Sequence, residues 1–191
     1  MLSRNFFRLK ALLGGAAQSR PLPAEEAPFR AELYSADQMA QHGKSLAAAH
    51  RLTAGHEPDR LLGRLAANEA TLVDVCKLLT SASAEKRRIA PAGEWLLDNF
   101  YLIEEQIRTA KRHLPKGYSR ELPRLANGPS AGLPRVYDIA LETVAHGDGR
   151  VDTETLSRFV AAYQTVSDLR LGELWAIPIM LRLAAIENLR R

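Results

Sequence analysis

The feature of the sequence that most constrains its fold is a helical spacing of apolar residues in EPDRLLGRLAANEATLVDVCKLLTSAS, residues 57–83. Apolar residues recur there at steps of three, four and seven: Leu61, Leu65, Leu72, Val75 and Leu79. Such steps place side chains on one face of an α-helix, whereas a half-buried strand alternates apolar and polar residues. The stretch therefore predicts an amphipathic helix, with Asp59 placed to cap it.

The same spacing continues along most of the chain. Helices are expected over residues 35–52, 91–113, 135–146, 153–167 and 172–191. Ser35 is placed to cap the first of these, and Pro91 suits the first turn of the second. Asp152 or Thr153 is placed to cap the helix over 153–167. Because no stretch shows the alternation of a half-buried strand, the sequence predicts an all-α fold: a bundle of about six helices with one long irregular connection.

The two ends of the chain differ from its helical middle. Residues 14–31 hold three prolines and two glycines, so residues 1–31 are predicted to be a disordered basic tail and linker, and residues 32–191 a single helical domain. An alternative has residues 1–13 lying on a membrane surface as a short amphipathic helix. The last helix reaches Arg191 without a capping glycine, which suggests an N-terminal module of a larger protein, truncated or separated from the rest of that protein.

Charge and cysteine content exclude several classes of protein. Part of the formal net charge of +4 comes from four residues near the N-terminus: Arg4, Arg8, Lys10 and Arg20. The remainder is close to neutral, so no nucleic-acid partner is predicted. The single cysteine, Cys76, excludes an internal disulfide and a cysteine-based zinc site, and it is expected to be a small buried side chain. No apolar run reaches the roughly 18 residues that a membrane span requires.

The stretch EWLLDNFYLIEEQI, residues 94–107, raises the question of whether it forms an active site or a buried helix. In a helix, one of its faces is apolar and is expected in the core: Leu96, Phe100, Ile103 and Ile107. Glu94, Asp98 and Glu105 lie on the opposite face. The adjacent acids Glu104 and Glu105 point about 100° apart on a helix, so we do not predict a catalytic pair, which must converge across a cleft. Glu104 and Arg108 predict an i,i+4 ion pair instead.

Other motifs provide no candidate catalytic, cofactor-binding or metal-binding residue. The histidines, at positions 42, 50, 56, 113 and 146, are dispersed, and we identify no metal-ligand pair with an acid at i,i+4. The stretch HGDGRVDTE resembles a calcium loop, but Thr153 and Phe159 stand where that loop requires glycine and glutamate. It predicts instead a corner in which Gly147 ends one helix and Asp152 caps the next. Serine-nucleophile, Walker and dinucleotide-binding motifs are absent from the sequence.

The long connection, PKGYSRELPRLANGPSAGLPRVY over residues 115–137, is the most suggestive segment for function. Long irregular segments are often functional, and Tyr and Arg dominate interaction hot spots. Its candidate docking residues are Tyr118, Arg120, Arg124, Arg135 and Tyr137. The alternative is a packed loop whose arginines pair with Glu94, Asp98, Glu121 or Glu142. Glu94, Asp98 and Glu105 are further candidate interaction residues, and we expect them to pair with arginines of residues 115–137. The sequence leaves both interpretations open.

Three long strings carry a resemblance to a known family. They are PAGEWLLDNFYLIEEQI, then HLPKGYSRELPRLANGPSAGLPRVYDIALETVAHGDGRVD, and then RFVAAYQTVSDLRLGELWAIPIMLRLAAIENLRR. These strings resemble the N-terminal region of the cyclic β-1,2-glucan synthases. The resemblance covers about residues 30–191 and is strongest from Pro91 onward.

The resemblance implies that this chain belongs to a larger enzyme, and it does not imply that the chain catalyses a reaction itself. The family consists of very large bacterial inner-membrane enzymes that polymerise glucose from UDP-glucose, close the glucan into a ring and trim it with a phosphorylase-like region. UDP-glucose and a divalent metal belong to family domains downstream of the matched part. No catalytic residue is carried over, because no position here matches one. The implied partners are the transferase or other domains of a synthase, at the cytoplasmic face of the inner membrane.

These observations support one main hypothesis and two alternatives. The main one is a non-catalytic N-terminal helical module that scaffolds the catalytic domains of a glucan synthase. The first alternative is a free-standing carbohydrate- or nucleotide-sugar-binding module, with five rings available for stacking: Trp95, Tyr101, Tyr118, Tyr137 and Trp175. Most of these rings are expected in the helical core. The second alternative is a helical adaptor whose N-terminus lies on a membrane surface.

Overall fold

The computed structural model describes residues 32–191 except 54–57, 115–116 and 148. These residues form an all-α structure whose elements are α2 (Ala36–Ala49), α3 (Leu61–Ala84), α4 (Pro91–His113), the 3-10 helix η1 (Tyr118–Glu121), α5 (Arg135–His146), α6 (Thr153–Gln164) and α7 (Leu171–Arg190). The predicted fold class and helices are therefore confirmed. The predicted tail, residues 1–31, and its proposed membrane contact lie outside the described residues.

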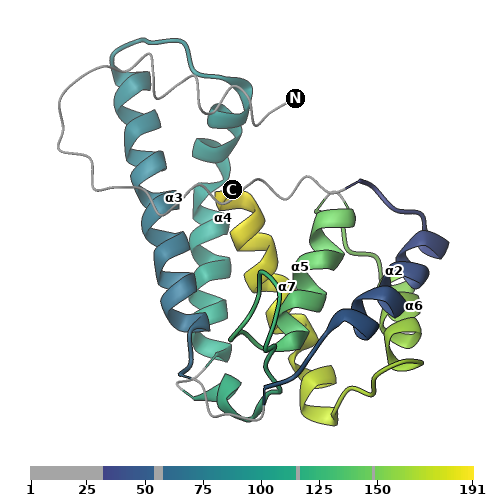
Figure 1. The fold of residues 1–191 in the computed structure, drawn as a ribbon. Helices are drawn as coiled ribbons and strands as arrows, with labels where there is room; N and C mark the ends of the chain where they lie inside the picture. Colours follow the sequence, from purple (N-terminus) through teal and green to yellow (C-terminus); the bar gives the residue numbers. More distant parts are fainter. Residues whose placement is uncertain (1–31, 54–57, 115–116, 148) are drawn as a thin grey trace.

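Three helix pairs make up the described structure (Figure 1). Helices α3 and α4 form a long hairpin, α5 packs against α7, and α2 packs against α6. Helix α7 also contacts α3 and α4, so it joins the hairpin to the rest of the bundle. None of the described helices combines the length and the apolar character that crossing a membrane takes.

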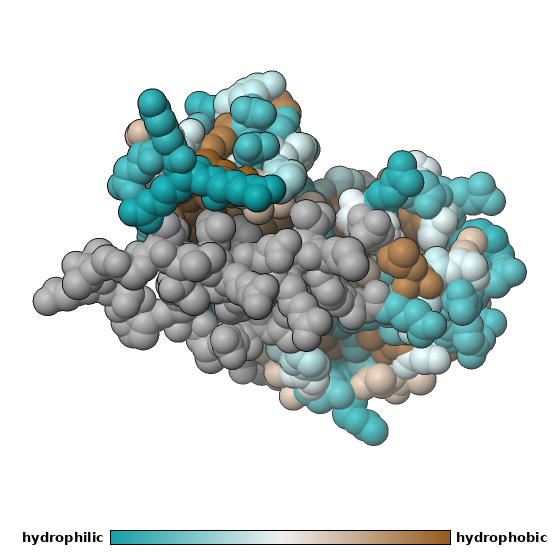
Figure 2. Space-filling view, turned by 90° about the horizontal axis from the view of Figure 1, so that it is seen from above, coloured by the Kyte–Doolittle hydropathy of each residue, from teal (hydrophilic) through white to brown (hydrophobic). Residues whose placement is uncertain are grey.

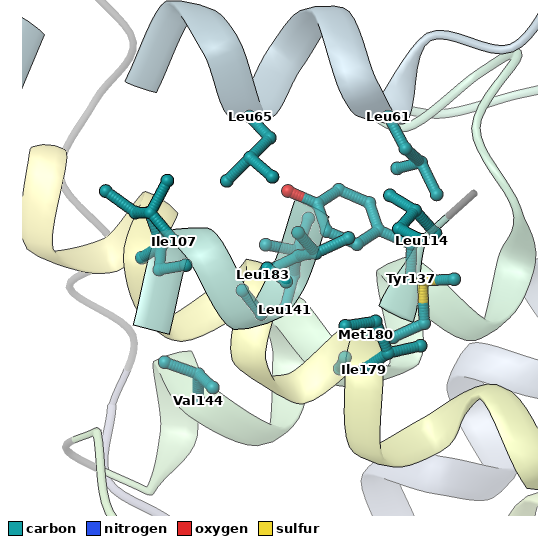
Figure 3. Packing of buried hydrophobic residues seen from close by; sticks show 14 of the residues in the cluster. Leu61, Leu65, Ile107, Leu114, Tyr137, Leu141, Val144, Ile179, Met180 and Leu183 are labelled. Atoms are coloured by element: carbon teal, nitrogen blue, oxygen red, sulfur yellow. The ribbon is translucent and has the colours of Figure 1, made fainter. Parts of the chain in front are cut away.

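The larger hydrophobic cluster lies between α3, α4, α5 and α7. Figure 3 shows Leu61 and Leu65 of α3 directed toward the ring of Tyr137 on α5, with Leu183 of α7 close by. All four side chains are buried. The apolar face predicted for residues 57–83 is thus the core face of α3, although Cys76 is half-buried and not buried as expected.

A smaller cluster lies between α2 and α6, and it includes Met39, Phe159 and Tyr163. The two helices approach closely at Gly43, where a Cβ atom would lie 2.8 Å from the Phe159 carbonyl oxygen. A side chain there would force the helices apart, so glycine permits this packing. Ile177 of α7 packs against both clusters and connects them.

The helix ends follow the signals in the sequence. Ser35 accepts from the Gln38 amide, and the Gln38 side chain accepts from the Ser35 amide, which makes a capping box. Asp152 caps α6 through the Thr155 amide at 2.7 Å, and this contact lowers the pKa of Asp152. Gly147 lies directly after the end of α5. The predicted corner between α5 and α6 is confirmed.

The long connection is folded onto the end of α2. The Thr53 amide donates to the Arg124 carbonyl at 2.9 Å, and the Ala126 amide donates to the Arg51 carbonyl at 2.7 Å. Within the connection, the Gly132 amide donates to the Leu125 carbonyl at 2.8 Å. Since Leu125 is itself buried, this connection is part of the packed structure.

Candidate functional site

Arg124, in the middle of the long connection, is buried and bonded to oxygen atoms of the chain. Its Nη1 donates to the Pro58 and Gly132 carbonyls at 3.0 and 2.9 Å. Its Nη2 donates to the carbonyl and hydroxyl oxygens of Ser119 at 3.2 and 3.1 Å. A buried guanidinium needs such acceptors, because leaving its donors unsatisfied would cost several kcal/mol. Arg124 therefore fixes the shape of the connection from inside.

Arg135 begins α5 and forms a buried two-pronged ion pair with Glu173 of α7. Its Nε donates to Oε1 at 2.7 Å and its Nη2 to Oε2 at 2.8 Å. Nη1 donates to the Ser167 hydroxyl at 2.9 Å. The hydrogen bonds to Glu173 raise the pKa of Arg135. Glu173 also accepts from the Arg170 amide at 2.9 Å, so the same carboxylate caps α7.

Glu187, near the end of α7, is a second buried carboxylate. It accepts from the Tyr137 hydroxyl at 2.5 Å and from Arg191 at 2.7 Å, and it also forms an ion pair with Arg64. Burial alone would raise the pKa of Glu187, but the hydrogen bonds from Arg64, Tyr137 and Arg191 lower it to about 2. Burial and the adjacent carboxylate raise the pKa of Tyr137.

His50 at the end of α2 links the long connection to α6. Its Nδ1 lies 2.8 Å from the Tyr163 hydroxyl and its Nε2 lies 3.0 Å from Asp138 Oδ2. The hydroxyl of Ser130, in the connection, donates to the other oxygen of Asp138. Burial raises the pKa of Tyr163. The network joins four parts of the chain: the end of α2, the connection, α5 and α6.

The structure places the five predicted docking residues in three environments. Arg124, Arg135 and Tyr137 are buried within the chain, and Tyr118 is half-buried against the core. Arg120 is exposed. The expected acid partners of the two buried arginines were wrong. Arg135 pairs with Glu173, and Arg124 bonds to carbonyl oxygens and to the Ser119 hydroxyl, so neither pairs with Glu94, Asp98, Glu121 or Glu142. A docking role stays a prediction for the exposed positions.

The acids of α4 lie on its solvent face, as the sequence predicted. Glu94, Asp98 and Glu105 are exposed. Glu94 and Asp98 line an open hollow of about 610 Å³ together with Arg87 and Arg88 of the α3–α4 connection. The arginines near these acids are therefore local to the hairpin.

The predicted ion pair between Glu104 and Arg108 is replaced by a contact with the backbone. The Nε of Arg108 donates to the carbonyl oxygen of Glu104 at 3.4 Å. Nearby, Lys111 bonds across to Glu69 of α3 at 2.5 Å, which ties the hairpin together. Both basic side chains lie on the exposed rim of α4, where ion pairs contribute at most about 1 kcal/mol.

Several large apolar side chains are exposed, contrary to the expectation that most aromatic rings lie in the core. On α4, Trp95 is 54% and Tyr101 62% exposed. On α7, Leu171 is 61% and Trp175 73% exposed, and these two lie one helical turn apart on the same face. Helix α4 begins at the free end of the hairpin and α7 at the opposite end of the molecule (Figure 1). From above, Figure 2 shows hydrophobic residues in separate patches among hydrophilic ones.

The side chains of His42, Glu142 and His146 come together between α2 and α5. Glu142 Oε2 lies 2.7 Å from His42 Nε2 and 3.3 Å from His146 Nε2. The sequence pattern did not predict this cluster. The spacing of Glu142 and His146 is itself an i,i+4 pairing of acid and histidine, so the statement that no such pair exists was wrong. His42 lies 100 residues from Glu142, and only the packing of α2 reveals it.

These features define an all-α module whose helices pack through two hydrophobic clusters and are also linked by buried charged pairs. No protein-family model matches the chain. It is 34% identical, over 164 residues, to the cyclic beta-(1,2)-glucan synthase NdvB of Rhizobium meliloti (strain 1021). The match covers 85% of this chain but only 6% of that protein. The resemblance found in the sequence is confirmed: the chain is homologous to one small region of a cyclic β-1,2-glucan synthase.

Proposed function

We propose that this chain is a non-catalytic N-terminal helical module of a cyclic β-1,2-glucan synthase. It supports UDP-glucose-dependent glucan synthesis by scaffolding the catalytic domains at the cytoplasmic face of the inner membrane. The observation that carries this proposal is the 34% identity to NdvB across 85% of the chain. A match to 6% of a very large protein is what a single accessory region of such an enzyme would give.

The distribution of charge within the chain supports a scaffolding role. The strongly perturbed groups, Tyr137 and Glu187, are buried and bonded to each other inside the bundle. Catalytic acids and bases need shifted pKa values together with access to a substrate. Here the shifted groups hold α5 to α7, so they stabilise the fold.

The exposed apolar side chains supply the surface for scaffolding. Leu171 and Trp175, which we call the α7 apolar strip, lie side by side on the first turns of α7. Tryptophan is among the residues that contribute most to protein interfaces, and covering two such side chains would remove apolar area from water. Arg170 and the exposed Asp168 next to the strip provide the polar rim that such interfaces commonly have.

The proposal is tested by replacing the homologous segment of NdvB with this chain and measuring cyclic glucan made from UDP-glucose. The chimera should make glucan, whereas NdvB with the segment deleted should lose most of its synthesis at an equal protein level. Full synthesis by the deleted enzyme would contradict a scaffolding role. The isolated chain should not turn over UDP-glucose, and measured turnover would contradict a non-catalytic role.

A second candidate, a carbohydrate- or nucleotide-sugar-binding module, is favoured by the exposure of Trp95, Tyr101 and Trp175. Exposed rings of this kind can stack on a sugar, and Arg87 and Arg88 beside the α4 hollow can pair with phosphate. Calorimetric titration with β-1,2-glucan and with UDP-glucose separates the two functions. Saturable heat that is lost in Trp95→Ala supports the binding module, and no heat supports the scaffold.

A further inference from the structure

The cluster of His42, Glu142 and His146 has hydrogen bonds that fix one of its rings. His146 Nδ1 lies 2.7 Å from the backbone carbonyl oxygen of Glu32. A carbonyl oxygen only accepts, so Nδ1 must carry a proton. In the neutral imidazole, Nε2 then presents its lone pair. That lone pair faces Glu142 Oε2 at 3.3 Å, an atom that also only accepts when the carboxylate is ionised.

A lone pair and a carboxylate oxygen that face each other form no hydrogen bond, so the contact between His146 and Glu142 lacks a bridging hydrogen atom in this tautomer. A metal ion held by both residues would supply the missing link. His42 adds a third ligand atom, because its Nε2 lies 2.7 Å from the same carboxylate oxygen. Three ligand atoms, from two histidines and one carboxylate, thus lie within 4.8 Å of one another.

We propose that His42, Glu142 and His146 form a binding site for a divalent transition-metal ion of the zinc class. Zinc takes nitrogen and oxygen ligands at roughly 2.0–2.2 Å, and tetrahedral ligands are then about 3.3–3.5 Å apart. His146 and Glu142 already have this separation, at 3.3 Å. His42 would move away from Glu142 by about 0.6 Å to reach it. Two histidines and a carboxylate leave a fourth position for water.

The surroundings of the cluster match those of known metal sites. A histidine that binds a metal through one nitrogen usually donates from the other to a carbonyl or a carboxylate, which is what His146 does through Glu32. The ring of Tyr34 stacks on His146 at 3.9 Å between centroids. His146 is buried, whereas the side chains of His42 and Glu142 are 22% and 30% exposed. An ion and its water can therefore enter from the solvent side.

A metal at this position would fasten the start of the described structure to the bundle. His42 belongs to α2, and His146 and Glu142 belong to α5. The Tyr34 amide also donates to the His146 carbonyl at 3.2 Å, so the residues leading into α2 are tied to the same histidine. Helices α2 and α5 would be joined through coordination in addition to the packing of the smaller cluster. Metal binding at these residues would be a property of the chain whether or not it supports glucan synthesis.

The test is titration of the chelator-treated full chain, free of any histidine tag, with Zn²⁺ by calorimetry and with Co²⁺ by visible absorption. We expect one ion per chain, a rise in Tm with zinc, and the intense Co²⁺ bands of a tetrahedral site. Glu142→Gln and His42→Asn should each weaken zinc binding at least tenfold and abolish those bands, while circular dichroism shows that they remain folded. His113→Asn, at an exposed histidine of α4, is the matched control and should bind like the parent.

Three results would overturn the proposal. One is the absence of saturable zinc or cobalt binding, which would leave the cluster as a set of packing and hydrogen-bond contacts. Another is unchanged zinc affinity in both Glu142→Gln and His42→Asn. The third is a loss of binding in His113→Asn equal to the loss in Glu142→Gln, which would place the ion elsewhere.

Discussion

The region formed by the long connection and the start of α5 differs from the first turns of α7 in which residues it buries. In the first region, Arg124 and Arg135 are buried. In the second, Leu171 and Trp175 are exposed. The arginines are tolerated inside because their donors meet carbonyl or carboxylate oxygens, whereas the α7 apolar strip has no apolar cover among the described residues. The buried arginines therefore fix the positions of the segments around them, and the α7 apolar strip is the candidate surface for a partner.

The largest effect should come from Glu173→Ala. It would leave the Arg135 guanidinium buried without its carboxylate, and breaking one side of a buried pair costs about 3–5 kcal/mol. The measurement is urea denaturation followed by circular dichroism. Glu105→Ala, at an exposed acid of α4, is the control and should change the free energy of unfolding by less than about 0.5 kcal/mol. Equal effects of the two variants would contradict the contrast between the regions.

The next largest effect on stability should come from lowering the pH. The folded-state pKa of Glu187 is about 2, below its usual 4.5, so its contribution is fully present above pH 4.5 and is lost as pH falls toward 2. That contribution is roughly 3 kcal/mol near neutral pH. The free energy of unfolding, measured by denaturation at several pH values, should fall over this window. Glu187→Gln should be less stable near neutral pH and should show a smaller fall, and an equal fall would contradict the assignment.

Tyr137→Phe should have an intermediate effect. It removes the hydroxyl that donates to Glu187 at 2.5 Å but keeps the ring in the core, so the expected loss is about 1–3 kcal/mol. Tyr101→Phe is the matched control, because Tyr101 is 62% exposed, and its stability should not change. Thermal unfolding of the two variants provides the comparison. A destabilisation by Tyr101→Phe as large as that by Tyr137→Phe would contradict it.

The smallest effect on stability should come from Trp175→Ser. The side chain is 73% exposed, so its removal should change the free energy of unfolding by no more than about 0.5 kcal/mol. Chemical denaturation measures this change. A loss of stability above about 2 kcal/mol would mean that Trp175 is packed within the chain. It would then contradict the claim that the α7 apolar strip is an exposed surface.

The helices could be predicted because their signals are local. The spacing of Leu61 and Leu65 placed the core face of α3, and Ser35 and Asp152 marked helix starts. The partners of the polar residues could not be predicted. Arg135 pairs with Glu173, which lies 38 residues further along the chain, and His42 contacts Glu142, which lies 100 residues further along. Such pairs depend on how helices pack, which a single sequence does not state.

The sequence also did not allow us to predict which aromatic side chains are exposed. On α4 the spacing placed Leu96, Ile103 and Ile107 in the core, but it did not show that Trp95 lies outside the core. Helix α7 is rich in apolar residues, and the spacing alone did not decide which of its apolar stripes faces the core. The contacts of α7 with α3, α4 and α5 decide this. The resemblance to glucan synthases could be recognised from the sequence alone, because it rests on long strings of residues and not on contacts between them.

The measurement that tests the account most directly is cyclic glucan synthesis by the NdvB chimera carrying Leu171→Ser and Trp175→Ser, compared with the chimera carrying the exposed control Glu105→Ala. Our account predicts that the double substitution reduces synthesis several-fold, that the control does not, and that both chimeras accumulate to the parent level. Equal synthesis by the parent, control and doubly substituted chimeras would show that the α7 apolar strip does not dock on the synthase.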